Sequence, residues 1–315
     1  MKIIYPILAL LVLLACNEPS KKTESRAQDE EPWQGWNKYQ IKPEDSLTLY
    51  GHELISNTAY YLGPKGKVGA LTNGMNCQNC HLEAGTIPFA NNYSAVVSTY
   101  PKHRDRSGAL ETIPKRVNDC MERSLNGKAL DTSSREMKAI LSYMHWLGDD
   151  IPKGKKPKGS GIMDIPLLDR PASPVRGLVV YVRTCARCHG AGGTGQPNPE
   201  GYGYTYPPLW GIHSYNTGAG LYRLSRFAGY VKNAMPFELA NYRHPVLSNE
   251  EAWDVAAYVN SRPRPEGNIS RDWPDISKKP FDHPFGPYVD GFSEQQHKFG
   301  PFKPIKDKAS ALAKK

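Results

Sequence analysis

The sequence lacks a hydrophobic run long enough to span a membrane. Its apolar N-terminal stretch, residues 3–15, is shorter than the roughly 20 residues that a membrane-spanning helix needs. The sequence also lacks dense runs of Lys and Arg interleaved with aromatic residues, although 40 Lys and Arg against 31 Asp and Glu give a net charge of +9. The basic balance favours anionic partners without distinguishing a membrane surface from small anions. The missing basic runs count against a nucleic-acid partner, and we expect none.

The N-terminus predicts export and lipidation. Residues 1–15 form a short signal peptide with one Lys and an apolar run that ends at the small residue Ala15. The tetrad Leu13-Leu14-Ala15-Cys16 resembles a bacterial lipoprotein processing box, in which cleavage before Cys16 frees its thiol for lipidation. The alternative is an ordinary secretory signal that is cut nearby. We expect a lipoprotein anchored to a membrane on its periplasmic side, with residues 16–40 as a flexible tether.

Cysteine is scarce outside two short motifs. Residues 77–81 (CQNCH) and 185–189 (CARCH) both match C-x-x-C-H, the attachment sequence of haem c. The two thiols of such a motif bind the haem vinyl groups, and the adjacent histidine binds the iron. A redox disulfide and half a zinc site are the alternatives, but no further Cys/His pairs remain for zinc. We therefore expect two covalently bound haem c groups, attached through Cys77, Cys80, Cys185 and Cys188, with His81 and His189 as iron ligands.

Similar surroundings of the two motifs predict an all-α fold of two cytochrome c modules in tandem, with long loops. A helix is expected over residues 43–60, and capping boxes at 133–136 and 248–251 begin further helices. The C-terminal residues have little helix pattern, but their aromatic side chains argue against disorder, so we expect an irregular tail that wraps across the body. The predicted parts are residues 41–150 (first module), 151–172 (a Pro/Gly/Lys linker), 173–265 (second module) and 266–315 (the tail).

Each iron needs a second axial ligand or keeps an open position. In the second module, residues 233–237 (NAMPF) resemble the distal methionine loop of ordinary cytochromes c, which predicts Met235, with Lys232 in reserve. His213 and His244 lie in the same interval. A His/Met haem has a raised reduction potential, which suits the exit of electrons.

The first module offers His103, Cys120 and Met121 as distal ligands. One hypothesis makes Met121 the ligand and Cys120 a buried small residue; the other puts the sulfur of Cys120 on the iron. Cationic neighbours stabilise a thiolate and bind small oxyanions. Those near Cys120 in sequence are Arg104, Arg106, Lys115, Arg116, Arg123 and Lys128.

Residues 116–127 (RVNDCMERSLNG) carry a resemblance to the bacterial dihaem thiosulfate dehydrogenases, which form tetrathionate. The resemblance covers most of residues 40–305 and includes 284–288 and 296–302 in the tail. It implies that the first haem is the active site and has Cys120 as its distal ligand. It also implies Met235, or a Lys that exchanges with Met, at the second haem. Arg106, Arg116 and Ser124 are implied to contact the oxygens of the substrate.

The resemblance further implies an oxidoreductase that converts two thiosulfate ions to tetrathionate, or carries out the reverse reaction. Electrons would leave through the second haem to a soluble or membrane acceptor, such as a small cytochrome c. Two alternatives remain open: a non-catalytic dihaem electron carrier with Met121 and Met235 on its irons, and a cysteine-ligated sulfur cytochrome that acts on a carrier-bound substrate.

Overall fold

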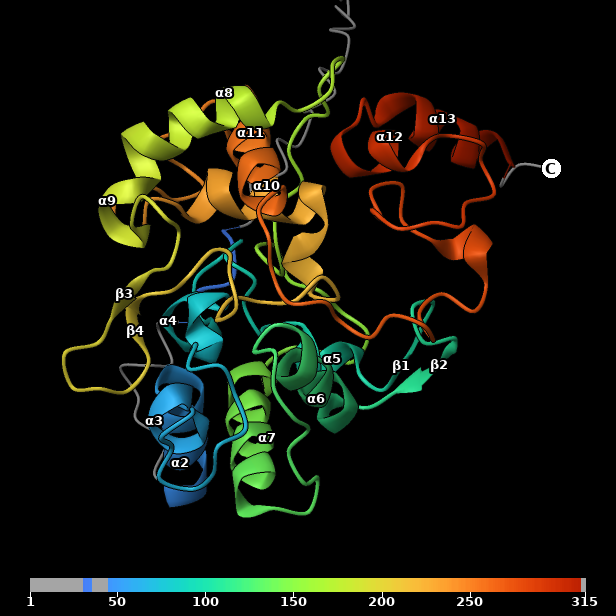
Figure 1. The fold of residues 1–315 in the computed structure, drawn as a ribbon. Coiled ribbons are helices and arrows are strands. Elements are labelled where there is room, and N and C mark those ends of the chain that lie inside the picture. Colours follow the sequence, from blue (N-terminus) through green and yellow to red (C-terminus); the bar gives the residue numbers. More distant parts are fainter. Residues whose placement is uncertain (1–30, 36–44, 313–315) are drawn as a thin grey trace, which may run out of the picture. The chain divides into compact units, whose positions relative to one another are not determined.

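Helices dominate the computed structural model, which describes residues 31–35 and 45–312 (Figure 1). The predicted signal peptide, the lipidation of Cys16 and most of the tether lie outside the described residues. No helix within the described ranges is both long and apolar enough to cross a membrane.

The first half contains α2 (Ser46–Ser56), α3 (Thr58–Leu62), η1 (Cys77–Asn79), α4 (Leu82–Gly85), α5 (Val96–Thr99), β1 (Lys102–Arg104), β2 (Ala109–Glu111), α6 (Ile113–Arg123) and α7 (Arg135–Gly148). The second half contains α8 (Pro174–Val180), η2 (Tyr181–Cys185), α9 (Ala186–His189), β3 (Gln196–Pro197), β4 (Tyr204–Tyr206), η3 (Gly220–Tyr222), α10 (Leu224–Ala234) and α11 (Asn249–Asn260). The tail adds η4 (Ile276–Lys278), α12 (Glu294–Phe299) and α13 (Lys303–Leu312). The strands form two small antiparallel pairs, β1 with β2 and β3 with β4.

The two halves repeat one helix pairing. In each half a helix that precedes the haem motif packs on the last helix of that half: α2 on α7, and α8 on α11 (Figure 1). Both crossings depend on a glycine. A Cβ atom on Gly51 would lie 2.0 Å from the carbonyl oxygen of Ala139, and one on Gly177 would lie 1.9 Å from that of Asp254. The backbones of each pair therefore approach more closely than any other residue allows.

Gly51→Ala should lower the free energy of unfolding by about 2 kcal/mol, because the clash with α7 outweighs the better helix propensity of alanine. Thermal unfolding of the haem-loaded protein, followed by far-ultraviolet circular dichroism, measures the change. Gly220→Ala is the matched control, since a Cβ there meets no atom within 4 Å. Equal stability of Gly51→Ala and the wild type would show that the two helices can separate without cost.

Helix starts agree with the sequence at one capping box and differ at the other. At α11 the Ser248 hydroxyl accepts from the Glu251 amide at 3.1 Å, and the Glu251 carboxylate accepts from the Ser248 amide at 2.9 Å. The box predicted over residues 133–136 does not form. Instead Ser134 caps α7 one residue later, and Glu136 accepts a hydrogen bond from the Tyr50 hydroxyl at 3.0 Å. A long-range partner for Glu136 thus replaces the local one.

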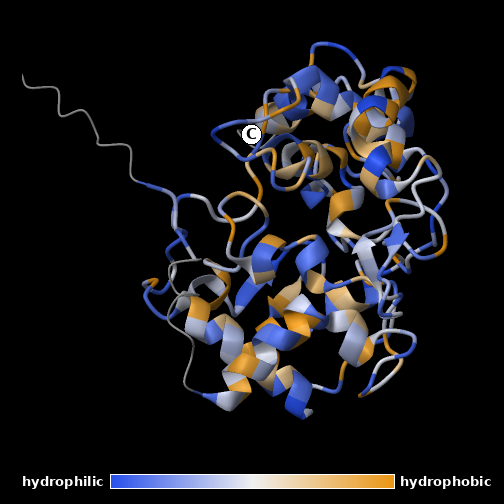
Figure 2. Cartoon of the chain, turned by 90° about the vertical axis from the view of Figure 1, so that its left-hand side faces the viewer, coloured by the Kyte–Doolittle hydropathy of each residue, from blue (hydrophilic) through white to orange (hydrophobic). Residues whose placement is uncertain are grey.

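Three hydrophobic clusters organise the interior. Two of them are centred on the two halves, although the first also includes Tyr215, Ala219 and Tyr222, and Figure 2 shows hydrophobic and hydrophilic residues alternating around their helices. The third cluster joins the halves, because it contains Leu82 and Ala90 from the first and Tyr230 and Ala234 from the second. The Tyr230 hydroxyl also donates to the carbonyl of Asn79 at 3.0 Å. The two haem motifs therefore face one shared interior region.

Residues 153–161, part of the predicted linker, are held against the first half; we call this segment the strap. The Ser98 hydroxyl donates to the carbonyl of Lys155 at 2.6 Å, and the amide of Gly154 donates to the carbonyl of Ser98 at 2.7 Å. Asn92 donates to the carbonyl of Gly159 at 2.7 Å. These hydrogen bonds hold the strap against the first half.

The tail contains helices α12 and α13, although the sequence shows little helix pattern there. Its residues contact both halves. Asp272 binds Arg106 and Arg123 of the first half, and Asp282 binds Arg223 of the second. The ring of Phe302 packs on that of Trp253, and the side chain of Ile305 is buried. Tertiary partners, more than local pattern, thus order the tail.

Candidate functional site: two sulfur-lined cavities

The first cavity, of about 320 Å³, is lined by both cysteines and the histidine of the first haem motif. Cys77, Cys80 and His81 lie in its wall together with Cys120 from α6. The wall combines apolar residues such as Ile55, Leu62 and Val96 with polar and cationic side chains. Two thiols, one imidazole and a further sulfur in one cavity are the groups that a covalent haem needs. The residues present fit a haem c.

His81 is prepared for an iron. Its Nδ1 lies 2.5 Å from the carbonyl oxygen of Asn91, so this nitrogen carries the hydrogen and the lone pair is on Nε2. Burial lowers the pKa of His81 to about 4, which keeps the ring neutral at pH 7. The amide of Asn91 in turn donates to the carbonyl of Gly161 at 2.8 Å. The strap therefore supports the residue that orients the predicted ligand.

Helix α6 presents three predicted site residues on one line. Arg116, Cys120 and Ser124 follow one another at intervals of four residues, so they share a face of the helix, and all three line the cavity. The Thr112 side chain caps the start of this helix. Met121 also reaches the wall, but its side chain is only 2% exposed and belongs to the hydrophobic core of the first half.

Arg116 faces the cavity without a hydrogen-bond or ion-pair partner among the described residues. The nearby Cys120 sulfur raises the pKa of Arg116, while burial opposes this shift. A guanidinium group beside a sulfur in an apolar wall is available to bind an anion. Ser124, at the end of the same line, adds a hydroxyl group.

Arg106 lies outside the cavity lining, although the sequence suggested that it contacts substrate. Its Nε donates to Asp272 at 2.8 Å and its Nη2 donates to the carbonyl of Gly218 at 2.7 Å. Arg123 forms two bonds to the same carboxylate, at 2.7 and 2.8 Å. Lys115 is paired with Asp119, and Lys128 does not line the cavity. Of the cations near Cys120 in sequence, only Arg104 and Arg116 reach the wall.

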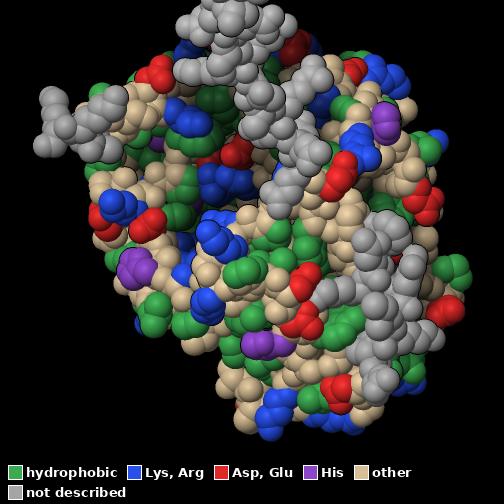
Figure 3. All heavy atoms as spheres, turned by 180° about the vertical axis from the view of Figure 1, so that it is seen from behind, with side chains coloured by type: hydrophobic (Ala, Val, Ile, Leu, Met, Phe, Trp, Pro, Cys, Tyr) green, Lys and Arg blue, Asp and Glu red, His purple; other side chains and the backbone are tan. Residues whose placement is uncertain are grey.

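Two lysines in the wall were absent from the predicted site. Lys102 precedes the segment that carried the resemblance, and Lys156 lies on the strap, which the sequence analysis treated only as a linker. The three consecutive residues Lys155, Lys156 and Pro157 give no local signal of which lysine turns inward. Figure 3 shows several Lys and Arg side chains gathered around a hollow in the left half of that view.

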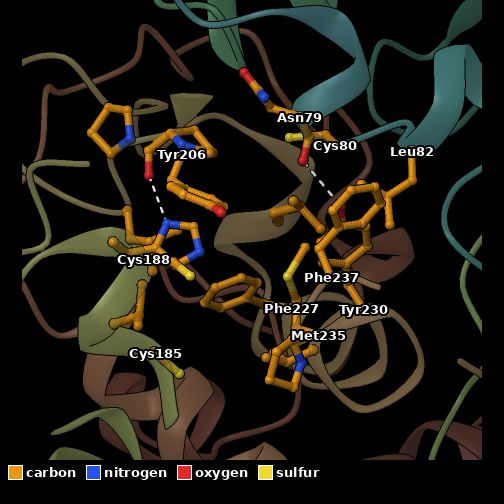
Figure 4. Close-up of a pocket in the computed structure, with 18 of the residues that line it drawn as sticks. Asn79, Cys80, Leu82, Cys185, Cys188, Tyr206, Phe227, Tyr230, Met235 and Phe237 are labelled. Carbon is orange, nitrogen blue, oxygen red and sulfur yellow. Dashed lines mark hydrogen bonds between the residues drawn. The ribbon is translucent and has the colours of Figure 1, made fainter. Parts of the chain in front are cut away.

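The second cavity, of about 460 Å³, contains the second haem motif and Met235. Figure 4 shows Cys185 and Cys188 on one side, with Met235, Tyr230 and Phe237 on the other. His189 has its Nδ1 2.8 Å from the carbonyl oxygen of Pro207, and burial lowers the pKa of its ring. This arrangement repeats that of His81 and fits a second haem c.

The other ligand candidates of the second half do not line the second cavity. The ammonium group of Lys232 donates a hydrogen bond to the carbonyl of Leu247, and Lys232 does not line the second cavity. His213 and His244 are absent from it as well. Of the ligand candidates that the sequence offered for this half, Met235, at the end of α10, is therefore the one in the wall.

Cys80 lines both cavities, and Asn79 reaches from the first motif into the second cavity (Figure 4). The two cofactor sites therefore adjoin at the first haem motif. Tyr230, bonded to the carbonyl of Asn79, lies in the same boundary.

Comparisons with known proteins match each half of the chain to a cytochrome c family. Residues 68–152 match the family described as SoxA/TsdA, cytochrome c domain, and residues 174–263 match the cytochrome c family. These matches confirm the prediction of two tandem cytochrome c domains and of two covalently bound haem c groups.

Curated relatives and a solved structure carry one common name. A thiosulfate dehydrogenase of Psychrobacter arcticus is 41% identical over 222 residues, which are 70% of this chain and 65% of that protein. One of Allochromatium vinosum is 41% identical over 61% of this chain and 71% of its own length. The solved thiosulfate dehydrogenase (TsdBA) of Marichromatium purpuratum is 30% identical with a TM-score of 0.65, over 72% of this chain and 48% of that one. The matched part of this chain thus spans less than two thirds of the Psychrobacter relative and about half of the Marichromatium chain.

Proposed function

This chain belongs to the thiosulfate dehydrogenase family, and from that premise we propose that it oxidises thiosulfate to tetrathionate in the first cavity. The reaction is 2 S2O3(2−) ⇌ S4O6(2−) + 2 e−, and the same site serves the reverse direction. One observation carries the proposal: Arg116, Cys120 and Ser124 lie on one face of α6 in the wall that also holds the first haem motif. A cation, a sulfur and a hydroxyl group are what an oxyanion with a reactive sulfur requires.

The sulfur of Cys120 would be the distal ligand of the first haem, with His81 as the ligand from the motif. Met121 is less suited to this role, because its side chain packs within the hydrophobic core of the first half. Arg116 supplies a positive charge beside the Cys120 sulfur. A thiolate ligand donates charge to the iron and lowers its reduction potential.

Arg116 and Ser124 would hold the sulfonate oxygens of thiosulfate. Two thiosulfate dianions repel each other, and this repulsion opposes the formation of a sulfur–sulfur bond. Fixed donors in a cavity that excludes water offset the repulsion without having to reorganise. Arg106 is held by Asp272 and the carbonyl of Gly218, and it would act indirectly, by positioning α6 and the β1–β2 hairpin.

Cys120 is also the proposed centre of the sulfur chemistry. Its thiolate bonds to the sulfane sulfur of one thiosulfate, and two electrons leave to give Cys–S–S–SO3(−). A second thiosulfate then attacks the sulfane sulfur, the bond to Cys120 breaks, and tetrathionate departs with the thiolate restored. The charges balance at both stages, and the net loss is two electrons.

The two haems, when bound at their motifs, would supply the redox chemistry that takes up one electron each. Cys80 lines both cavities, which supports passage of electrons from the first site to the second. Met235 is the proposed distal ligand there, and the raised potential of a His/Met haem suits delivery to an outside acceptor such as a small cytochrome c. The proposed lipid on Cys16 would keep the protein at a membrane on the periplasmic side, near such acceptors.

Met235→Leu should lower the reduction potential of the second haem by on the order of 0.1 V, because it removes the thioether ligand while preserving side-chain volume. A redox titration of the purified dihaem protein measures this potential. Lys232→Met is the control and should leave the potential unchanged, since Lys232 does not line the cavity and its ammonium group donates to the Leu247 carbonyl. An unchanged potential in Met235→Leu would remove Met235 from the iron.

The experiment that tests the function is steady-state oxidation of free thiosulfate by the haem-loaded protein with an artificial electron acceptor. We expect two electrons accepted for each tetrathionate formed. A protein that neither oxidises thiosulfate nor reduces tetrathionate would instead be an electron carrier, or an enzyme that acts on carrier-bound sulfur. If Cys120 still binds the iron in such an inactive protein, the enzyme that acts on carrier-bound sulfur is favoured. If Cys120 does not bind the iron, the electron carrier is favoured.

A further inference from the structure

The first cavity has more positive charge than one bound substrate needs. Four cationic side chains line it: Lys102, Arg104, Arg116 and Lys156. None of its described lining residues is Asp or Glu. A wall that has several cations and no acidic side chain among its described residues attracts anions. The low dielectric constant of the surroundings strengthens this attraction.

The four cations are not equivalent. Arg104 is compensated, since its Nε lies 3.3 Å from the Glu111 carboxylate and its Nη1 donates to the Tyr100 hydroxyl at 3.1 Å. Lys102 and Lys156 have no carboxylate within ion-pair distance in the described part of the chain. The ammonium group of Lys102 lies 4.6 Å from the centre of the Tyr100 ring, and Glu111, its cross-strand neighbour, makes its ion pair with Arg104.

The positions of the two lysines are fixed by the fold. Lys102 and Arg104 share one face of β1, because side chains alternate along a strand, and His103 between them is exposed on the other face. Lys156 is exposed and sits on the strap, whose backbone is bonded to Ser98 on one side and to Asn92 on the other. Its charge therefore lies at the mouth of the cavity.

The charges of these side chains act on one another. Burial lowers the pKa of Lys102, and the charges of Arg104, Lys156 and Arg116 lower it further, while the charge of Glu111, its cross-strand neighbour, raises it. Lys102 therefore feels the charges of both Lys156 and Arg116. An anion bound among these groups would relieve their mutual repulsion.

We propose that Lys102 and Lys156 form a second anion subsite, which holds the second thiosulfate while Arg116 and Ser124 hold the first beside Cys120. This inference rests on the proposed function, because joining two thiosulfate ions requires two dianions in one cavity at the same time. The subsite takes a tetrahedral sulfur oxyanion, through its sulfonate oxygens, and takes part in no bond change. The other source of negative charge for these lysines is the propionate groups of the first haem.

The experiment compares Lys156→Gln with Lys155→Gln in the haem-loaded protein. The two lysines are adjacent on the strap and exposed, but only Lys156 lines the cavity. At low ionic strength Lys156→Gln and Lys102→Gln should raise the KM for thiosulfate by about fivefold or more and change kcat less than about twofold. Lys155→Gln should keep the wild-type KM, and Lys156→Arg should have a KM close to the wild-type value. Added sodium chloride should reduce the difference in KM between Lys156→Gln and the wild type.

A redox titration of the same variants without thiosulfate separates the two sources of the anion. If the lysines instead hold the haem propionates, Lys156→Gln should shift the potential of the first haem and leave the KM for thiosulfate unchanged. That result would overturn the proposal. Equal KM values in Lys156→Gln and Lys155→Gln would overturn it as well.

Sulfate, which has no sulfane sulfur to oxidise, keeps the test independent of turnover. Titration calorimetry of the oxidised wild type with sulfate should show binding that weakens in Lys156→Gln but not in Lys155→Gln. This pattern in a protein that is inactive on thiosulfate would sink the proposed function and still support the anion subsite. Absence of sulfate binding in the wild type, or equal binding in both variants, would contradict the subsite.

Discussion

Cys120→Ala should lower kcat/KM for thiosulfate by at least about 1,000-fold, because it removes the sulfur that we propose both binds the iron and carries the sulfane sulfur. Cys120 shares one face of α6 with Arg116 and Ser124, and that face lines the first cavity. Alanine is a good helix former, so α6 should persist. Both haems should remain, since Cys77 and Cys80 attach the first haem independently of Cys120. The measurement is steady-state thiosulfate oxidation, normalised to the haem content of each preparation.

Met121→Leu is the matched control for Cys120→Ala, since it removes the neighbouring sulfur and preserves side-chain volume. Met121 is almost fully buried in the core of the first half. We expect its loss to change kcat/KM less than about threefold. The reverse result, with an active Cys120→Ala and an inactive Met121→Leu, would make Met121 the ligand and leave Cys120 as a bystander.

Asp272→Asn should lower the free energy of unfolding by about 3 kcal/mol, because two largely buried guanidinium groups lose their carboxylate. Asp272 lies in the tail and is 7% exposed; it binds Arg106 and Arg123 at 2.7–2.8 Å. Arg106 and Arg123 belong to the first half, so this cluster fixes the tail beside the hairpin and the end of α6. Thermal unfolding by circular dichroism gives the difference. Asp275→Asn, at an exposed site three residues further on, is the control and should cost less than about 1 kcal/mol.

The loss in Asp272→Asn should depend on pH in a defined direction. Burial alone would raise the pKa of Asp272, but the hydrogen bonds and charges of Arg123 and Arg106 outweigh burial and hold it below 3.8. A carboxylate with a depressed pKa stabilises the fold above its unfolded pKa, and this contribution disappears as the pH falls through the folded value. The stability gap should therefore stay constant from pH 7 to about pH 4 and shrink in stronger acid. A gap that widens in acid would contradict this account of the cluster.

Much of the site could be predicted from sequence because its chemistry is local. The C-x-x-C-H motifs place each pair of thiols beside its histidine within five residues, and both motifs line cavities together with Cys120 or Met235. Arg116, Cys120 and Ser124 were implied together by the family resemblance, and their shared face became visible only with α6, which the sequence analysis did not expect. Short-range geometry was therefore sufficient for the motifs alone.

The remaining features depend on contacts between distant residues, which local spacing does not reveal. Arg106, for which the resemblance implied a substrate contact, pairs with Asp272, 166 residues further along the chain, and lies outside the lining of the first cavity. Lys156 lies in a segment whose composition indicates a linker, yet bonds from Ser98 and Asn92 hold that segment on the cavity. The tail helices α12 and α13 form against partners in the second half, such as Trp253 on Phe302. In each case tertiary packing selects among options that the local sequence leaves open.

The central claim is that the sulfur of Cys120 meets the iron in the first cavity and makes that cavity the reaction centre. Low-temperature electron paramagnetic resonance of the oxidised, haem-loaded protein tests it most directly, because thiolate-ligated low-spin haem has a narrower spread of g values than His/Met haem. We predict two low-spin signals in the wild type, one narrow and one of the His/Met kind, with only the narrow one lost in Cys120→Ala. Two His/Met signals in the wild type, unchanged by Cys120→Ala, would contradict the claim and favour the non-catalytic electron carrier.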